Sequence, residues 1–85
     1  MAESHPYNVI ESSAFLDSVT QTLGDLRIWD DLKYFFEGFV ARNPLLFEEI
    51  PGTDWRAVLI LTDPLRTLYF SVDLINETIT YEALE

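Results

Sequence analysis

The chain has 85 residues, enough for one domain built around one hydrophobic core. Fifteen Asp and Glu against five Lys and Arg give a formal charge of −10. Because nucleic-acid binding depends on clustered cations, this balance disfavours autonomous binding to DNA or RNA. The chain has no cysteine, which excludes disulfides and thiolate metal sites.

The hydrophobic share of 48% is typical of a folded protein and too high for a disordered one. The longest apolar run, at 57–61, is far shorter than the roughly 20 residues of a membrane helix. The first six residues contain no apolar run that would indicate a signal peptide. We therefore expect a cytoplasmic protein that does not enter the membrane, folded as a single domain over 1–85.

The first half of the chain predicts a helical hairpin. Residues 7–10 form a short strand or an extended lead-in. Ser12 and Ser13 are N-cap candidates for a helix that ends at Gly24, and a second helix is predicted over 25–43 because Pro44 stops it. The short connection between the helices indicates that they are antiparallel.

The second predicted helix is amphipathic, with a largely aromatic face that must be covered by the rest of the protein. Seven apolar residues share one arc of this helix: Ile28, Trp29, Leu32, Phe35, Phe36, Phe39 and Val40. This helical spacing is typical of a core-facing stripe rather than of a cofactor site.

The second half predicts three strands. After a turn at 51–54, the apolar segment 55–62 suits a central strand buried on both faces. Residues 66–73 and 78–83 alternate, with Leu68, Phe70 and Val72 on one side of the first and Ile79 in phase with Tyr81 in the second. The order (β)-α-α-β-β-β predicts an α+β fold in which the helical hairpin covers one face of a small antiparallel meander.

No metal or cofactor site is predicted. The three glycines are isolated from one another, so no phosphate-binding loop is present, and no loop has the spacing of a calcium site. The single histidine, His5, lies near the terminus, and N-capping explains Ser12 and Ser13 better than a catalytic triad does.

An ordered set of short motifs in the second half resembles the RelE/ParE superfamily of type II toxin–antitoxin systems, which includes plasmid stabilisation proteins. The motifs are Asn43-Pro44, Ile50-Pro51-Gly52-Thr53, Trp55-Arg56, Leu65-Arg66-Thr67-Leu68-Tyr69 and Thr78-Ile79-Thr80-Tyr81. The resemblance spans most of the chain, and the superfamily's order of elements agrees with the order predicted from periodicity.

The resemblance implies a set of candidate site residues. Arg56 and Arg66 match the superfamily's strand arginines, and Tyr69 matches the tyrosine of its Arg-x-x-Tyr motif. A ribosome-dependent endoribonuclease, the activity of some members, would use Arg56, Arg66 and Tyr81 for charge and acid–base chemistry. Side chains alternate between the two faces along a strand, however, and Arg66 and Tyr69 are an odd number of residues apart, so they point to opposite faces.

Cleavage of RNA is disfavoured by the acidic composition. Nuclease members carry basic residues on the first hairpin strand and just past the last strand, where cations stabilise charge on the phosphate. This chain has Glu82 and Glu85 at its end instead. The resemblance then implies a protein that acts by binding other proteins, as gyrase-directed members do.

The expected partner is an antitoxin-like protein or a basic protein segment, because the chain is strongly negative. We predict that it binds the exposed face of the meander through Arg66, Thr67, Tyr69 and Ser71. Three alternatives stay open: a ribonuclease, an acidic interaction domain without toxic activity, and strand arginines that only pair with Asp54, Asp73 or Glu82. An uncovered edge strand would also allow a homodimer.

Overall fold

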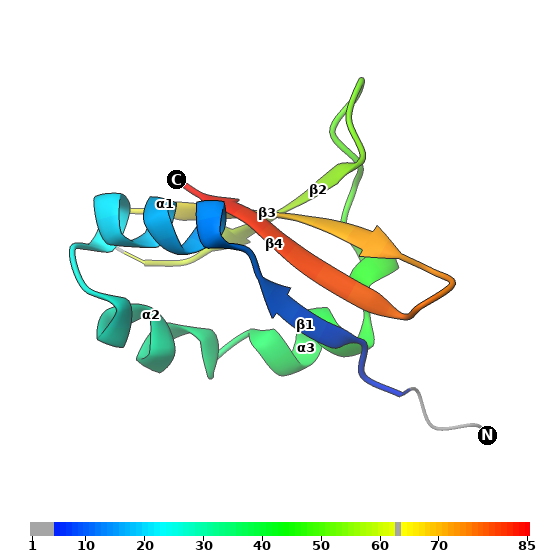
Figure 1. Cartoon of the computed structure of the whole chain (residues 1–85), viewed down its shortest axis with the longest axis horizontal. Coiled ribbons are helices and arrows are strands. Elements are labelled where there is room, and N and C mark those ends of the chain that lie inside the picture. Colours follow the sequence, from blue (N-terminus) through cyan, green and yellow to red (C-terminus); the bar gives the residue numbers. More distant parts are fainter. Residues whose placement is uncertain (1–4, 63) are drawn as a thin grey trace.

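The computed structural model describes residues 5–62 and 64–85. Its elements form one helical layer and one sheet (Figure 1). In chain order they are β1 (Asn8–Glu11), α1 (Ser13–Leu23), α2 (Leu26–Lys33), α3 (Glu37–Arg42), a 3₁₀ turn (Pro44–Leu46), β2 (Trp55–Ile60), β3 (Arg66–Asp73) and β4 (Thr78–Leu84). The α+β class is confirmed.

The sheet has the strand order β1-β4-β3-β2. The predicted antiparallel meander is confirmed for β2, β3 and β4, whereas β1 pairs with β4 in parallel and makes the sheet mixed. The prediction that 55–62 forms a central, doubly buried strand is wrong, because β1 occupies the far side of β4 and leaves β2 at the other edge. Leu59 on β2 is accordingly 54% exposed.

The predicted single helix over 25–43 is two helices. The chain turns at Tyr34, Phe35 and Phe36, and Phe36 has a non-helical φ of −136°. The run of three aromatic residues and Gly38 lowers helix propensity here, and the turn lets Phe36 pack on Trp29 with ring centroids 5.6 Å apart. The helix continues as α3 in a new direction.

This break corrects the predicted apolar arc. Trp29 and Val40 are buried, each 1% exposed, and Leu32 and Phe36 pack partly against the core. Three members of the arc are exposed instead: Ile28, Phe35 and Phe39. A continuous helix would have kept all seven on one side, whereas the turn redirects Phe35 to solvent.

Capping interactions fix α1 on the sheet. The hydroxyl of Ser12 accepts the N–H of Phe15 at 3.0 Å and donates to the carbonyl of Tyr81 in β4 at 3.0 Å. Gly24 ends the helix in the left-handed conformation with φ 82°, which glycine adopts without steric cost. Figure 1 shows α2 returning beside α1 after this turn, as the predicted hairpin requires.

The core lies between the helices and one face of the sheet. Phe15 of α1, Trp29 of α2 and Tyr81 of β4 are in mutual contact, with ring centroids 5.1 to 5.8 Å apart. Leu68 and Phe70 face this cluster from β3, as their predicted alternation required. Within the described part of the chain, no helix is long and apolar enough to span a membrane.

Candidate functional site

The face of the sheet opposite the core is the candidate site, and we call it the open face. The register places Trp55 opposite Ser71 and Ala57 opposite Tyr69. These residues have the opposite parity to the buried Phe70, so their side chains point away from the helices. Any molecule that lies on the sheet would meet this surface.

The centre of the open face is an aromatic pair. The rings of Trp55 and Tyr69 lie 5.9 Å apart at an angle of 38°. Trp55 is 37% exposed, and Tyr69 is half-buried. Large, rigid side chains of this kind supply contact area at a low cost in conformational entropy, which suits a binding platform.

Two carboxylates are tied to this platform by hydrogen bonds. The phenol of Tyr69 donates to Glu85 Oε2 at 3.0 Å, and this bond raises the pKa of the phenol. The hydroxyl of Ser71 donates to Glu82 Oε2 at 2.6 Å. Both bonds fix a negative charge beside the aromatic pair.

A β-bulge brings Glu82 to its position. The pairing of β3 with β4 shifts between Tyr69, which lies opposite Ala83, and Phe70, which lies opposite Tyr81. Glu82 is the extra residue between these two pairs. A bulge of this kind redirects a side chain and increases local twist, so that Glu82 reaches Ser71 rather than the core.

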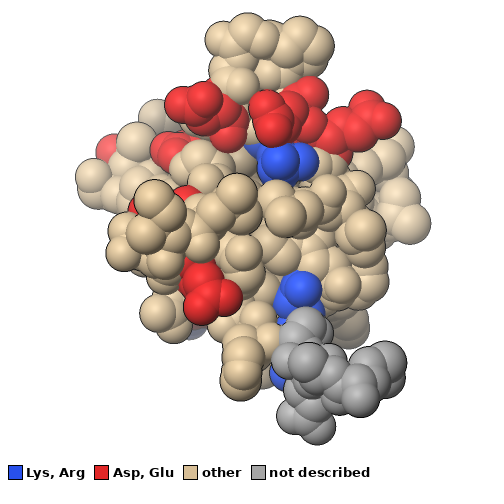
Figure 2. Space-filling view, turned by 90° about the vertical axis from the view of Figure 1, so that its right-hand side faces the viewer, with Lys and Arg blue, Asp and Glu red and all other residues tan. Residues whose placement is uncertain are grey.

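The open face carries no cation. Its positions in the four strands, all of which the structure describes, include neither Lys nor Arg. The acidic character continues at one end of the sheet, where Figure 2 shows acidic side chains gathered around a small basic group. Glu49, Asp54, Asp73 and Arg56 line a hollow of about 360 Å³ at this end.

Arg56 has a structural role. It lies opposite Phe70, on the side of the sheet that faces the core. Its guanidinium donates to the carbonyl of Phe47 and, at 3.0 Å, to Glu49 Oε1, with only 17% of the side chain exposed. The arginine therefore holds the 44–54 connector against β2. The ion pair is with Glu49 rather than with Asp54, Asp73 or Glu82, the expected partners.

Tyr81 lies inside the core. Its side chain has no exposed surface, and its phenol donates to Glu37 Oε1 at 3.1 Å. Burial raises the pKa of this phenol strongly, and the nearby carboxylate of Glu37 acts in the same direction. Proton transfer to a ligand on the open face would require Tyr81 to leave the core.

The candidate residues from the sequence divide between the two faces. Arg66 lies opposite Ile60 and has the parity of buried Leu68, so it shares the core side with Arg56 and Tyr81. Thr67, Tyr69 and Ser71 lie on the open face. The structure therefore brings together three of the four predicted partner-binding residues and separates Arg66 from them.

Sequence reasoning did not select Trp55 as a site residue. It considered Glu82 and Glu85 as replacements for cations and Glu82 also as an ion-pair partner of the strand arginines, but neither as part of a binding surface. Antiparallel pairing of the predicted strands at 55–62 and 66–73, which only a few residues separate, could have revealed the contact between Trp55 and Tyr69, because it aligns the two segments. The bulge at Glu82 has no comparable local signal. Among the described residues, no group of three His, Asp or Glu side chains could hold a metal ion.

Comparison with solved structures identifies the fold. The chain is similar to a chain in the crystal structure of the toxin–antitoxin complex RelBE2 from Mycobacterium tuberculosis, with a TM-score of 0.73 and 17% sequence identity. The similarity covers 95% of this chain and 98% of that one. The protein has a RelE/ParE-like fold. No protein-family model matches the sequence, and no curated protein matches it.

Proposed function

We propose that this protein is a toxin-like component of a toxin–antitoxin system that acts by binding a target protein and not by cleaving RNA. The observation that carries the proposal is the open face, where Trp55 and Tyr69 form an aromatic pair beside Glu82 and Glu85. The RelE/ParE-like fold supports the assignment to such a system, with an antitoxin-like protein as its partner.

The charge of the open face favours a protein target over RNA. Cleavage of a phosphodiester needs cations that stabilise the developing negative charge, and carboxylates at this surface would repel the phosphate instead. A Lys or Arg side chain of a protein is attracted by both features, because it can lie over an aromatic ring and pair with a carboxylate. The target surface is therefore expected to be basic.

Inducible expression in a bacterial host tests this proposal. We expect wild-type protein to arrest growth while cellular messenger RNA stays uncut. Trp55→Ala should abolish the arrest, and Ile75→Ala should not, because Ile75 is 93% exposed at the β3–β4 turn and lies outside the platform. Soluble, folded expression of each protein is confirmed in parallel by circular dichroism.

Three results would contradict the proposal. Messenger RNA cleaved during the arrest would indicate the ribonuclease alternative. Arrest that persists in Trp55→Ala would remove the platform from the mechanism. A folded wild-type protein that leaves growth unchanged would favour the third possibility, an acidic interaction domain without toxic activity.

A further inference from the structure

The two carboxylates of the open face lie at either end of Tyr69 along the strands. Tyr69 is opposite Ala83 in β4, and Thr67 pairs with Glu85 through two backbone hydrogen bonds of 2.9 and 3.0 Å. The bulge places Glu82 on the same face, on the other side of Ala83. Ala83 is therefore the small residue that separates the two acidic side chains beside the ring.

The ring of Tyr69 is covered on one side only. Trp55 contacts it from β2, with ring centroids 5.9 Å apart. Its neighbour on the β4 side is Ala83, and a single methyl group is too small to cover a phenol ring. Because Tyr69 is half-buried, part of its ring surface meets solvent. A planar group has room to lie against the ring on the β4 side.

Both carboxylates are held in place and keep an acceptor. The phenol of Tyr69 donates to Oε2 of Glu85, and the hydroxyl of Ser71 donates to Oε2 of Glu82. Among the residues that the structure describes, no hydrogen bond or ion pair engages Oε1 of either side chain. Since the hydroxyl groups already fix both carboxylates, an incoming donor pays little of the entropic cost of ordering them.

This combination favours a guanidinium over an ammonium. A guanidinium is planar and weakly hydrated, so it can lie on an aromatic ring while its N–H groups donate to a carboxylate. An ammonium is a compact, strongly hydrated charge without a flat surface. An arginine side chain would use the ring and the carboxylates together, whereas a lysine would gain mainly from the charge.

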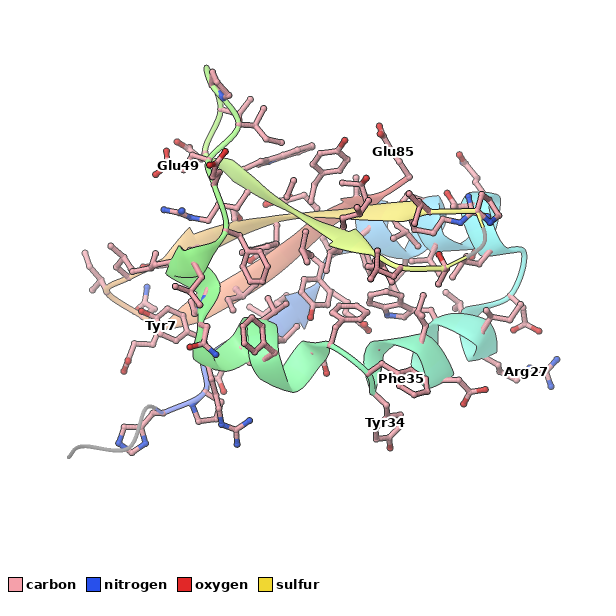
Figure 3. The ribbon with its side chains drawn as sticks, turned by 180° about the vertical axis from the view of Figure 1, so that it is seen from behind. Tyr7, Arg27, Tyr34, Phe35, Glu49 and Glu85 are labelled. Atoms are coloured by element: carbon pink, nitrogen blue, oxygen red, sulfur yellow. The ribbon has the colours of Figure 1, made fainter. Side chains whose placement is uncertain are left out.

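The chain's own cations lie elsewhere. The two strand arginines are on the core side of the sheet, and the other three Lys and Arg residues belong to α2 and α3. Arg27, whose side chain is 88% exposed, pairs with Asp25 at 2.9 Å. Figure 3 shows Glu85 above the sheet and Arg27 below it, at the helical layer.

Charge argues against a second copy as the occupant. Each copy carries a formal charge of −10, so two copies repel each other at long range. A basic protein has the complementary charge and gains attraction where a second copy loses it. The arginine is therefore expected to come from a different protein.

We propose that the β4 side of Tyr69 is a site for one arginine side chain of the target protein, a claim that rests on the proposed function. The guanidinium lies against the ring above Ala83 and donates to Glu85, which is bonded to the phenol of the same ring. Glu82 adds negative charge from the other end, and Trp55 holds the ring in position from β2. The platform thereby distinguishes arginine from lysine at the point of contact.

Titration of the protein with capped tripeptides, followed by nuclear magnetic resonance, tests the proposal. One probe carries arginine between two glycines, and the other carries lysine there, so their charges are equal. We expect the arginine tripeptide to bind wild-type protein about fivefold more tightly, the factor typical of a cation on an exposed aromatic ring. The amide resonances of Tyr69 and Ala83 should shift as it binds.

Three variants separate stacking from general attraction. Glu85→Gln should weaken the arginine tripeptide by about fivefold, through loss of a charged hydrogen bond. Asp17→Asn is its matched control, because it removes one charge from an exposed side chain of α1, and it should bind as wild type does. Ala83→Leu keeps every charge but covers the ring, so it should weaken the arginine tripeptide and leave the lysine tripeptide unchanged. Circular dichroism confirms that each variant is folded.

The proposal is overturned if the two tripeptides bind equally, if Glu85→Gln and Asp17→Asn behave alike, or if Ala83→Leu keeps the preference for arginine. Self-association of the wild-type protein that Glu85→Gln abolishes would also overturn it, by assigning the site to a second copy. Growth arrest separates this proposal from the proposed function. A preference for arginine without arrest removes only the proposed function, whereas arrest that depends on Trp55 without that preference removes only the arginine site.

Discussion

The buried phenol of Tyr81 predicts a loss of stability at alkaline pH. Burial raises the pKa of this phenol well above the value of about 10 found in an unfolded chain. The folded protein therefore keeps a proton that the unfolded chain releases above pH 10. The stabilisation is fully present below the unfolded pKa and is lost as pH rises toward the folded pKa, by about 1.4 kcal/mol per pH unit for one proton.

Tyr81→Phe should remove this dependence. The variant keeps the ring contacts with Phe15 and Trp29 and loses the hydrogen bond to Glu37 Oε1, which is worth about 1 kcal/mol at neutral pH. Wild-type protein is then the more stable by that amount at pH 7. Because ionisation of the unfolded chain costs the wild-type protein about 1.4 kcal/mol by pH 11, of which about 0.4 is already lost at pH 10, the two proteins should become equally stable between pH 10 and 11.

Urea unfolding followed by tryptophan fluorescence at pH 7, 10 and 11 measures both stabilities. Other titrating groups are shared by the two proteins, so the difference between them isolates Tyr81. Ultraviolet absorbance provides a second measurement, since one of the four tyrosines should fail to ionise until the protein unfolds. A constant stability difference from pH 7 to 11, or four tyrosines that all ionise in the folded state, would refute the reasoning.

Three further predictions concern single features. Glu11→Ala should cost about 2 kcal/mol in urea unfolding, because Glu11 accepts the indole N–H of buried Trp29; a Glu11→Gln variant that loses as much would contradict this reading. Gly24→Ala should cost about 1 kcal/mol through its φ of 82° alone, since nothing crowds its Cβ position, and equal melting temperatures would disprove it. Salt should slow association of a basic target with the Trp55 platform more than it speeds dissociation, which stopped-flow measurements can check.

Local signals in the sequence were sufficient to predict where α1 begins and ends and which face the residues of β3 occupy. Ser12 begins α1 and Gly24 ends it because each satisfies a requirement of the helix terminus itself. The alternation in β3 and β4 correctly placed Phe70 and Ile79 on the core side, since the two-residue period of a strand does not depend on its neighbours.

Non-local contacts decided the features that the sequence did not predict. The apolar segment at 55–62 suits a buried strand, yet it lies at an edge because β1, from the opposite end of the chain, takes the place beside β4. The helix break at Phe35 likewise depends on where the sheet places the pocket for Phe36 and Trp29. Neither contact is encoded in the spacing of nearby residues.

The candidate site shows the same division. The alternation of side chains along β3 predicted that Arg66 and Tyr69 lie on opposite faces of the sheet, and the observed strand register agrees. The alternation put Tyr81 in phase with apolar Ile79, whereas the family resemblance implied a chemical role for it. The structure places Tyr81 where the alternation does, with no exposed surface. When the two kinds of inference disagree, physical periodicity is the better guide to side-chain placement.

The distribution of charge connects the fold to the proposed mode of action. A charge of −10 attracts basic proteins over a range of several ångströms but does not choose where they bind. Short-range features make that choice. The platform offers two aromatic rings beside two hydrogen-bonded carboxylates, so a Lys or Arg side chain that reaches it can contact a ring and pair with a carboxylate at the same time. Long-range attraction therefore sets how fast a basic target arrives, and the platform sets where it stays.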